Sequence, residues 1–339
     1  MLNYTDEYVA DLQNIRNLVP NIEKLENKKI LVTGAGGLIC SAVVDFLLEI
    51  GVQVYAAGRD KGKIETRFQK RVFYSNFYFF HYDATEVFSA TEDFDFIIHG
   101  ASNADPRAII NYPVETMVAN INGIRNLLEY SKSHFCRVLY ISSSEVYGKK
   151  KGDEPYNEND LGYLDILNPR ACYPSSKRAA ETLCASYKKE YGVDVVIVRP
   201  GHIYGPTCTD RDSRVASQFP RDVKAGKNIT LKSDGLQMRS YCYVLDCVSA
   251  IITVLLNGIS GEAYNISNKN SVVNIREMAE YFAKASGQSV LFEKAAAREK
   301  EGYNLMDNSS LDGGKLEALG WRGLFNMAVG ARKTLEAMY

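Results

Sequence analysis

This sequence has few cysteines and no long apolar run. Its seven cysteines include no C-x-x-C pair and are odd in number, so we expect neither a disulfide framework nor a zinc cluster. Apolar stretches such as Ala250–Leu256 fall far short of the roughly 20 residues that cross a bilayer. The N-terminal segment is acidic and interrupted by polar residues, unlike a signal peptide. These absences predict a cytoplasmic protein with no membrane partner and no metal site.

An excess of charge of either sign is also missing. The chain carries 40 basic and 41 acidic side chains, which leaves a formal net charge of −1. This balance gives no indication of a nucleic-acid partner. With 46% hydrophobic and 24% charged residues the composition is globular. A length of 339 residues suggests about two domains at roughly 150 residues each.

Short apolar runs alternate with helical stretches through the first 200 residues. Four runs are apolar throughout, as expected of strands buried on both faces: Lys29–Thr33, Phe94–His99, Val138–Ser142 and Val193–Val198. Strict alternation of strand and helix predicts an α/β fold with a doubly wound parallel sheet. Apolar spacing over residues 4–26 predicts one amphipathic helix ahead of that sheet. We therefore expect a helical extension at 1–26, a dinucleotide-binding domain at 27–200 and a smaller, mainly substrate-binding lobe at 201–339.

A glycine-rich turn, VTGAGGLIC, joins the first predicted strand to a helix. Gly34 and Gly37 stand where a tight turn lets a diphosphate approach the backbone N–H groups of Leu38 and Ile39 at the helix N-terminus. A third glycine is usual where Cys40 stands, so the packing there is expected to be looser. The position of the turn between strand and helix predicts a Rossmann-type site for NAD(P).

The end of the second strand leaves the choice between NAD and NADP open. The carboxylate that would bind an adenosine ribose hydroxyl is absent, and Gly58 and Arg59 stand in its place. Arg59 can pair with a 2′-phosphate, stack on adenine or remain in solvent. Asp83, at the end of the third strand, is a candidate partner for the adenine amino group or a cap of its own turn.

Two later segments carry the residues expected to do chemistry. YISSSEVYG ends an apolar strand and places Ser143 and Glu145 at the carboxyl edge of the sheet, where ligands of such sheets bind. YPSSK sets Tyr173 and Lys177 four residues apart on one helix face. The Lys177 ammonium is predicted to lower the pKa of the phenol, which would make Tyr173 a usable base. Ser143 can bind the same substrate hydroxyl.

With these motifs the chain resembles the extended short-chain dehydrogenases/reductases of the nucleotide-sugar epimerase/dehydratase group, over residues 28–339. The matching segments run in the family's order and include VTGAGGLIC, HGASNADP, SSSEVYG, YPSSK, VRPGHIYGP, RSYCYVLDCVSAI and KLEALGW. Within that group it is most similar to the UDP-glucuronate decarboxylases. The resemblance implies the catalytic set Ser143, Glu145, Tyr173 and Lys177, with Ala101, Tyr173 and Lys177 also touching the cofactor. It implies substrate contacts at Ser144, His202, Arg214 and Arg239, a UDP-sugar substrate and a homodimer formed through helices at 112–134 and 173–191.

The chain also departs from the decarboxylase pattern. Pro174, Ser175 and Ser176 replace an acidic pair after the tyrosine, EGYNLMDNSS at 301–310 replaces an arginine-rich segment, and His202 replaces an asparagine. Each departure falls where the family holds substrate, so the sugar stays open.

The residues support several outcomes that share a transient 4-keto sugar. A carboxylate on C5 would leave as CO2, loss of water from C6 would give a 4-keto-6-deoxy sugar, and hydride return to the other face would give a 4-epimer. Glu145 distinguishes them, because an epimerase needs no carboxylate beside C5 and C6. Ser144 before Glu145 disfavours a glucose-type dehydratase. A UDP-glucuronate decarboxylase-like activity is therefore favoured over a 4,6-dehydratase or 4-epimerase, and a ketoreductase or a non-catalytic nucleotide sensor is less favoured.

Two further polar residues are interpreted as structural. His99, at a strand end, is expected to be a hydrogen-bonded packing residue. Asn120, within an otherwise apolar helix, is expected to bond to neighbouring backbone.

Overall fold

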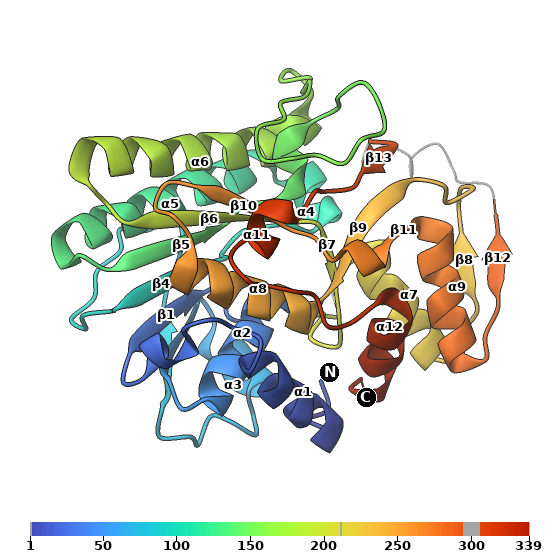
Figure 1. The fold of residues 1–339 in the computed structure, drawn as a ribbon, viewed down its shortest axis with the longest axis horizontal. Coiled ribbons are helices and arrows are strands. Elements are labelled where there is room, and N and C mark those ends of the chain that lie inside the picture. The colour runs from blue at the N-terminus through green and yellow to red at the C-terminus, as the bar shows by residue number, and fades with distance from the viewer. Residues whose placement is uncertain (1, 211, 294–305, 339) are drawn as a thin grey trace.

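A seven-stranded parallel sheet forms the larger part of the protein, in a computed structural model that describes residues 2–210, 212–293 and 306–338 (Figure 1). Its strand order is β10-β6-β5-β4-β1-β2-β3, and every neighbouring pair is parallel. The strands are β1 (Lys29–Thr33), β2 (Gln53–Gly58), β3 (Phe77–His81), β4 (Phe96–His99), β5 (Arg137–Ile141), β6 (Val195–Pro200) and β10 (Ala263–Ile266). The order reverses beside β1, so a crevice opens at the carboxyl ends of β1 and β4.

Helices cover both faces of this sheet. One face carries α2 (Leu38–Glu49), α3 (Lys61–Arg67) and α8 (Val244–Asn257), and the other carries α4 (Pro106–Asn111), α5 (Pro113–His134) and α6 (Cys172–Tyr191). Along β1, Ile30 and Val32 join the core under α2 while Leu31 joins the core under α5. Burial on both faces explains why the strands are apolar without alternation, and the predicted doubly wound α/β fold is confirmed.

The smaller lobe is built on a four-stranded sheet in which β9 (Met238–Tyr243) is central. The other strands are β7 (His202–Tyr204), β11 (Val272–Asn274) and β13 (Asn308–Ser309), and a separate pair is formed by β8 (Ile229–Leu231) and β12 (Val290–Phe292). Its helices are α7 (Val215–Lys224), α9 (Ile275–Ser286) and α12 (Met327–Glu336), and the short α11 (Gly314–Glu317) contacts β10. The chain returns to the large sheet after residue 200, because α8 and β10 pack there.

The N-terminal segment differs from the single helix predicted over residues 4–26. It contains α1 (Asp6–Arg16) and a separate 3-10 turn, η1 (Ile22–Leu25). Pro20 precedes Asn21, which has a φ of 61°, and this left-handed residue turns the chain between the two elements. α1 packs against α2 and α8, and its Asp11 pairs with Lys333 of α12 at 2.6 Å. The extension therefore joins the sheet domain to the smaller lobe.

No helix in the described part of the chain is long and apolar enough to span a membrane. The seven cysteines are all free and buried. Within residues 2–210, 212–293 and 306–338 no cluster of histidine, cysteine and carboxylate side chains could hold a metal ion.

Candidate active site

The glycine-rich turn lies at the carboxyl end of β1, as predicted. Gly34 has a φ of +71°, and a Cβ there would lie 2.8 Å from the Gly100 carbonyl oxygen. Only glycine fits this conformation and this close approach. Gly37 is the N-cap of α2, and no side chain caps the helix or adds an acidic group to its first turn. The helix N-terminus therefore presents Leu38 and Ile39 with backbone N–H groups available for an anion.

Cys40 fills the third position of the glycine motif without disturbing the turn. It is buried, and a Cβ on residue 100 would overlap its sulfur. Gly100, directly after β4, therefore provides the room that Cys40 requires. The close approach of the two residues leaves no room for a side chain at position 100. Ala101 follows, and its N–H lies 3.4 Å from the Thr33 hydroxyl.

Arg59 and Asp83 lie at the ends of β2 and β3, which are neighbours in the sheet. Asp83 accepts hydrogen bonds from the backbone N–H and hydroxyl of Thr85, at 2.9 and 2.7 Å. These bonds, together with the charge of Arg59, lower the pKa of Asp83. Asp83 therefore caps its own turn, one of the two predicted roles, and Arg59 is an exposed cation beside it.

The pair Tyr173 and Lys177 lies on the first turns of α6, facing the end of β5. Lys177 donates to the Ile141 carbonyl oxygen at 2.8 Å, and its Nζ is 5.8 Å from the centre of the Tyr173 ring. The phenol does not have the lowered pKa predicted above. Burial and the charge of Glu145 raise the pKa of Tyr173 to about 12, while a hydrogen bond with Ser143 lowers it. Burial lowers the pKa of Lys177 to about 7.

Glu145 lies on the tight turn η2 (Ser144–Tyr147) that follows β5, and Ser143 is the N-cap of this turn. The hydroxyl of Ser143 accepts a hydrogen bond from the Glu145 N–H at 3.2 Å, so it caps this turn. Ser144 is buried at the start of the turn. The Glu145 carboxylate pairs with Arg170 at 3.0 Å. The prediction did not single out Arg170; its position in NPRACY, three residues before Tyr173, was the only available signal.

The candidate substrate residues of the smaller lobe surround the same region. His202 on β7 is close enough for the charges of Arg239 and Arg214 to act on it; burial and these charges lower its pKa to about 3. Its Nδ1 is buried and has no hydrogen-bond partner among the described residues. Arg239 on β9 is 4% exposed, and burial lowers its pKa although Glu145 and Asp307 act in the opposite direction. It has no carboxylate within ion-pair distance in the part of the chain that the structure describes.

Arg214 and Asn120 each have a side-chain partner in the structure. Arg214 forms an ion pair with Asp212 at 2.5 Å, so its charge is already partly matched. Asn120 does not bond to neighbouring backbone; its amide donates to the Ser176 hydroxyl at 2.9 Å, and Ser176 donates to the Tyr173 carbonyl oxygen at 3.0 Å. This chain of contacts connects α5 to the start of α6.

His99 has the structural role predicted for it. It is buried, and its Nδ1 lies 2.7 Å from the Thr33 hydroxyl. Its ring stacks on Tyr140, and burial lowers its pKa to about 3.

The segment at 301–310 that departs from the decarboxylase pattern lies partly outside the described residues, since 301–305 are not among them.

A cofactor fits the residues at the crevice. Besides the glycine turn and the uncapped N-terminus of α2, the hydroxyls of Ser102 after β4 and Ser142 after β5 are buried and lack partners among the described residues. These groups converge on the carboxyl ends of β1, β4 and β5, where a dinucleotide lies in open parallel sheets.

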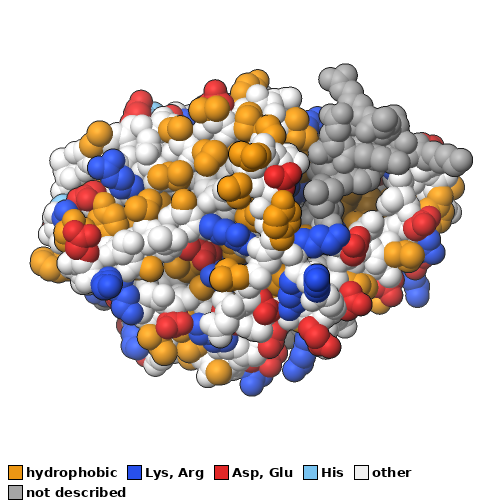
Figure 2. All heavy atoms as spheres, turned by 90° about the horizontal axis from the view of Figure 1, so that it is seen from above, with side chains coloured by type: hydrophobic (Ala, Val, Ile, Leu, Met, Phe, Trp, Pro, Cys, Tyr) orange, Lys and Arg blue, Asp and Glu red, His pale blue; other side chains and the backbone are white. Residues whose placement is uncertain are grey.

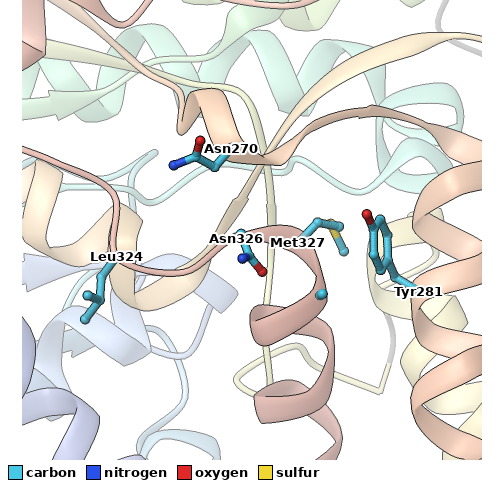
Figure 3. Close-up of a pocket in the computed structure, with 6 residues that line it drawn as sticks. Asn270, Tyr281, Leu324, Asn326 and Met327 are labelled. Carbon is cyan, nitrogen blue, oxygen red and sulfur yellow. The ribbon is translucent and has the colours of Figure 1, made fainter.

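A separate hollow of about 340 Å³ lies on the smaller lobe, between α9 and the start of α12 (Figure 3). It is lined by Asn270, Tyr281, Leu324, Asn326, Met327 and Ala328. None of these is a candidate site residue.

Comparison with known proteins agrees with this geometry. Residues 30–267 match the model of the NAD dependent epimerase/dehydratase family. UDP-glucuronic acid decarboxylase 6 of Arabidopsis thaliana is 33% identical over 255 residues, which are 75% of this chain and 73% of that protein. UDP-glucuronic acid decarboxylase 1 of Xenopus tropicalis is 28% identical over 345 residues, covering 98% of this chain and 79% of the relative.

Among solved structures, a UDP-glucose 4-epimerase of Thermus thermophilus in complex with NAD is similar, with a TM-score of 0.78 and 25% identity over 91% of this chain and 98% of that chain. A UDP-glucuronic acid 4-epimerase of Bacillus cereus has a TM-score of 0.75 at 25% identity, with the same two coverages. Sheet order and crevice are thus shared with proteins that bind NAD.

Proposed function

The chain belongs to the NAD dependent epimerase/dehydratase family, and from this premise we propose that it is a UDP-glucuronate decarboxylase. The family and the relatives make it an NAD(P)-dependent enzyme that modifies nucleotide sugars. The observation that carries the finer proposal is the position of Glu145. Its carboxylate pairs with Arg170, three residues before Tyr173, and its charge contributes to the raised pKa of Tyr173, so a carboxylate lies near the proposed base where a 4-epimerase needs none.

The chain's own residues divide the work of the reaction. The bound NAD(P) supplies a hydride acceptor that later returns the hydride. The Gly34 turn and the first turn of α2 would hold its diphosphate, and Arg59 would contact its adenosine end. Tyr173 would take the proton of a sugar C4 hydroxyl that Ser143 also binds. Lys177, which the Ile141 carbonyl holds in place, would orient the ribose beside it.

Removal of the C4 hydrogen leaves a ketone that activates C5. If C5 bears a carboxylate, the β-keto acid loses CO2, C5 takes up a proton, and the ketone is reduced again with no net redox change. Glu145, whose charge contributes to the raised pKa of Tyr173, would lie beside C5 and supply the proton that C5 takes up. Arg239, which has no carboxylate partner in the described residues, would bind the anionic part of the substrate.

The test is to incubate the purified protein with UDP-glucuronate, without added reductant, and to follow CO2 release and product mass. We expect CO2 loss that Tyr173→Phe abolishes, with no net NAD(P)H. Conversion of a neutral nucleotide hexose instead, with loss of water or no change in mass, would reassign the enzyme as a 4,6-dehydratase or 4-epimerase. Steady consumption of added NADPH would identify the protein as a ketoreductase. Bound cofactor without turnover of any nucleotide sugar would identify it as a non-catalytic sensor.

Two further properties belong to the proposal. We propose a homodimer through α5 and α6, supported by exposed apolar side chains on them such as Val114, Val118 and Tyr191. Figure 2, which views the molecule from the side of α6, shows hydrophobic side chains spread over this face. We also propose a cytoplasmic location, which the seven free thiols support.

A further inference from the structure

We propose that Arg170 is a positioning residue that sets the orientation of the Glu145 carboxylate; this proposal rests on the proposed function. One guanidinium nitrogen, Nη2, lies 3.0 Å from Glu145 Oε1. The two side chains are 19% and 25% exposed, so the pair is only partly screened by water. Arg170 is 25 residues away from Glu145 in the chain, and the fold brings them together.

The backbone around Arg170 is fixed by the same unit that carries Tyr173. Arg170 lies on a short 3-10 turn, η3 (Pro169–Ala171), that runs directly into α6. The Asn168 side chain accepts from the Arg170 N–H at 2.9 Å, and Pro169 stands at the first position of the turn. The guanidinium and the phenol therefore start from one rigid segment, and the carboxylate that Arg170 binds is held at a set place relative to Tyr173.

A second arginine of α6 holds the turn that carries Glu145. Arg178 donates from Nε to the Val146 carbonyl oxygen at 2.6 Å and from Nη2 to the Tyr147 carbonyl oxygen at 3.1 Å. Arg178 thus fixes the backbone of η2, whereas the Arg170 guanidinium hydrogen-bonds, within the described part of the chain, to the carboxylate alone. Loss of the Arg170 guanidinium would release the Glu145 side chain while the turn itself stays attached to α6.

The charges around the site are consistent with this role. Glu145 raises the pKa of the Tyr173 phenol, and Arg170 lowers it. Arg170 therefore offsets, at the base, the charge of the carboxylate that it orients. Its Nε is buried without a hydrogen-bond partner among the described residues, so a direct contact with substrate is the rival role that the experiment must separate.

The experiment is a double-mutant cycle on decarboxylation of UDP-glucuronate with Arg170→Met, Glu145→Gln and the pair. We expect Arg170→Met to lower kcat about ten- to hundredfold with KM within about threefold, the size of effect that follows misplacement of a reacting group. Arg170→Lys should recover part of the loss. In the Glu145→Gln background, Arg170→Met should cause no further loss, because Arg170 acts through the carboxylate.

Additive losses in the double variant, or a loss confined to KM, would overturn the proposal in favour of direct substrate contact, and an unchanged kcat would overturn it outright. Arg332→Met is the matched control, since it removes an exposed pair with Glu336 at 2.8 Å on α12 and should leave kcat unchanged.

A second readout needs neither cofactor nor substrate. The same four proteins are unfolded in urea, and we expect the two substitutions to be non-additive in the unfolding midpoint, as residues in contact are. Additive midpoints would overturn the Arg170 proposal even if the wild-type protein is active. Absence of wild-type turnover on UDP-glucuronate, with non-additive midpoints, would instead overturn the proposed function and leave the contact established.

Discussion

Cys40, on the first turn of α2, and Gly100, directly after β4, are complementary in size. A Cβ on residue 100 would overlap the Cys40 sulfur and lie 3.2 Å from Ile141. We expect Gly100→Ala to destabilise the protein by about 1–3 kcal/mol, the usual cost of overpacking. In the Cys40→Gly background the same change should cost less than half as much, because the sulfur is gone. Urea denaturation of the four proteins checks this, and equal costs in both backgrounds would contradict it.

Burial of His202, a single residue, makes the stability of the protein depend on pH. Burial and the charges of Arg239 and Arg214 lower its pKa to about 3, whereas an unfolded histidine titrates near pH ~6.5. Between these values the unfolded chain binds the additional proton, so stability falls as the pH is lowered through that window. We expect His202→Asn to reduce the dependence of the unfolding free energy on pH by about 1.4 kcal/mol per pH unit.

The measurement is urea denaturation of the cofactor-free protein from pH 7 to 4. The exposed His81→Asn is the control. An equal change of slope in both variants would show that the effect does not come from burial of His202.

Among elements, the contacts between α1, α2 and α3 meet at Asp45. This fully buried carboxylate accepts from Tyr4 at 2.6 Å and Tyr8 at 3.2 Å, and pairs with Arg67 at 2.7 Å. We expect Asp45→Ala to lower the unfolding free energy by about 3–5 kcal/mol, because Arg67 would keep a nearly buried charge without its ion-pair partner and Arg71 would keep only Glu49. Denaturant titration measures this.

Glu65→Ala on α3 is the control, since it removes only an exposed pair with Lys61 at 3.7 Å. Its effect should stay within about 0.5 kcal/mol. A loss below about 1 kcal/mol for Asp45→Ala would show that α1 is not held through this carboxylate.

At the scale of an element, the turn from β2 to α3 carries the residue expected to affect the choice between NAD and NADP. Arg59 is exposed there, and no carboxylate takes the place that would favour NAD. We expect Arg59→Ala to weaken NADPH binding about tenfold or more and NADH binding less than threefold, the loss of one charge-assisted contact to a phosphate. Cofactor fluorescence titration measures both affinities. Equal losses would mean that Arg59 stacks on adenine, and no loss that it remains in solvent.

For the whole molecule, exposed apolar side chains on the outer face of α5 and α6 predict that two copies of the chain associate. Val118 on α5 is 39% exposed and Val114 67% exposed. We expect Val118→Glu to convert a dimer to a monomer, because a charge at a shared apolar face is desolvated on both copies. Light scattering after gel filtration measures the mass. Phe73→Glu, which alters an exposed apolar residue on the loop between α3 and β3, should leave the dimer intact. A monomeric wild-type protein would contradict the prediction.

The fold could be predicted from the sequence because each pattern that indicates it lies within one short segment. Apolar strands such as Lys29–Thr33, the strand-turn-helix position of Gly34, and the four-residue spacing of Tyr173 and Lys177 each lie within one short segment. Such patterns depend on backbone geometry and on burial of both sheet faces, so sequence alone determines the parallel sheet, the crevice and the residues that stand at its edge.

Only the tertiary structure decided the contacts between distant segments. In the folded chain Arg170 forms an ion pair with Glu145, and the Cys40 sulfur lies close to Gly100. The Asn120 amide donates a hydrogen bond to the Ser176 hydroxyl. Lys177 donates to the Ile141 carbonyl oxygen, and the Tyr173 phenol is buried. The pKa of Tyr173 is therefore raised, whereas the four-residue spacing alone predicted that it would be lowered. The pKa of a side chain depends on its burial and on the charges near it, and every element packed around it contributes to both. These elements come from distant parts of the chain, so no single stretch of sequence predicts the pKa.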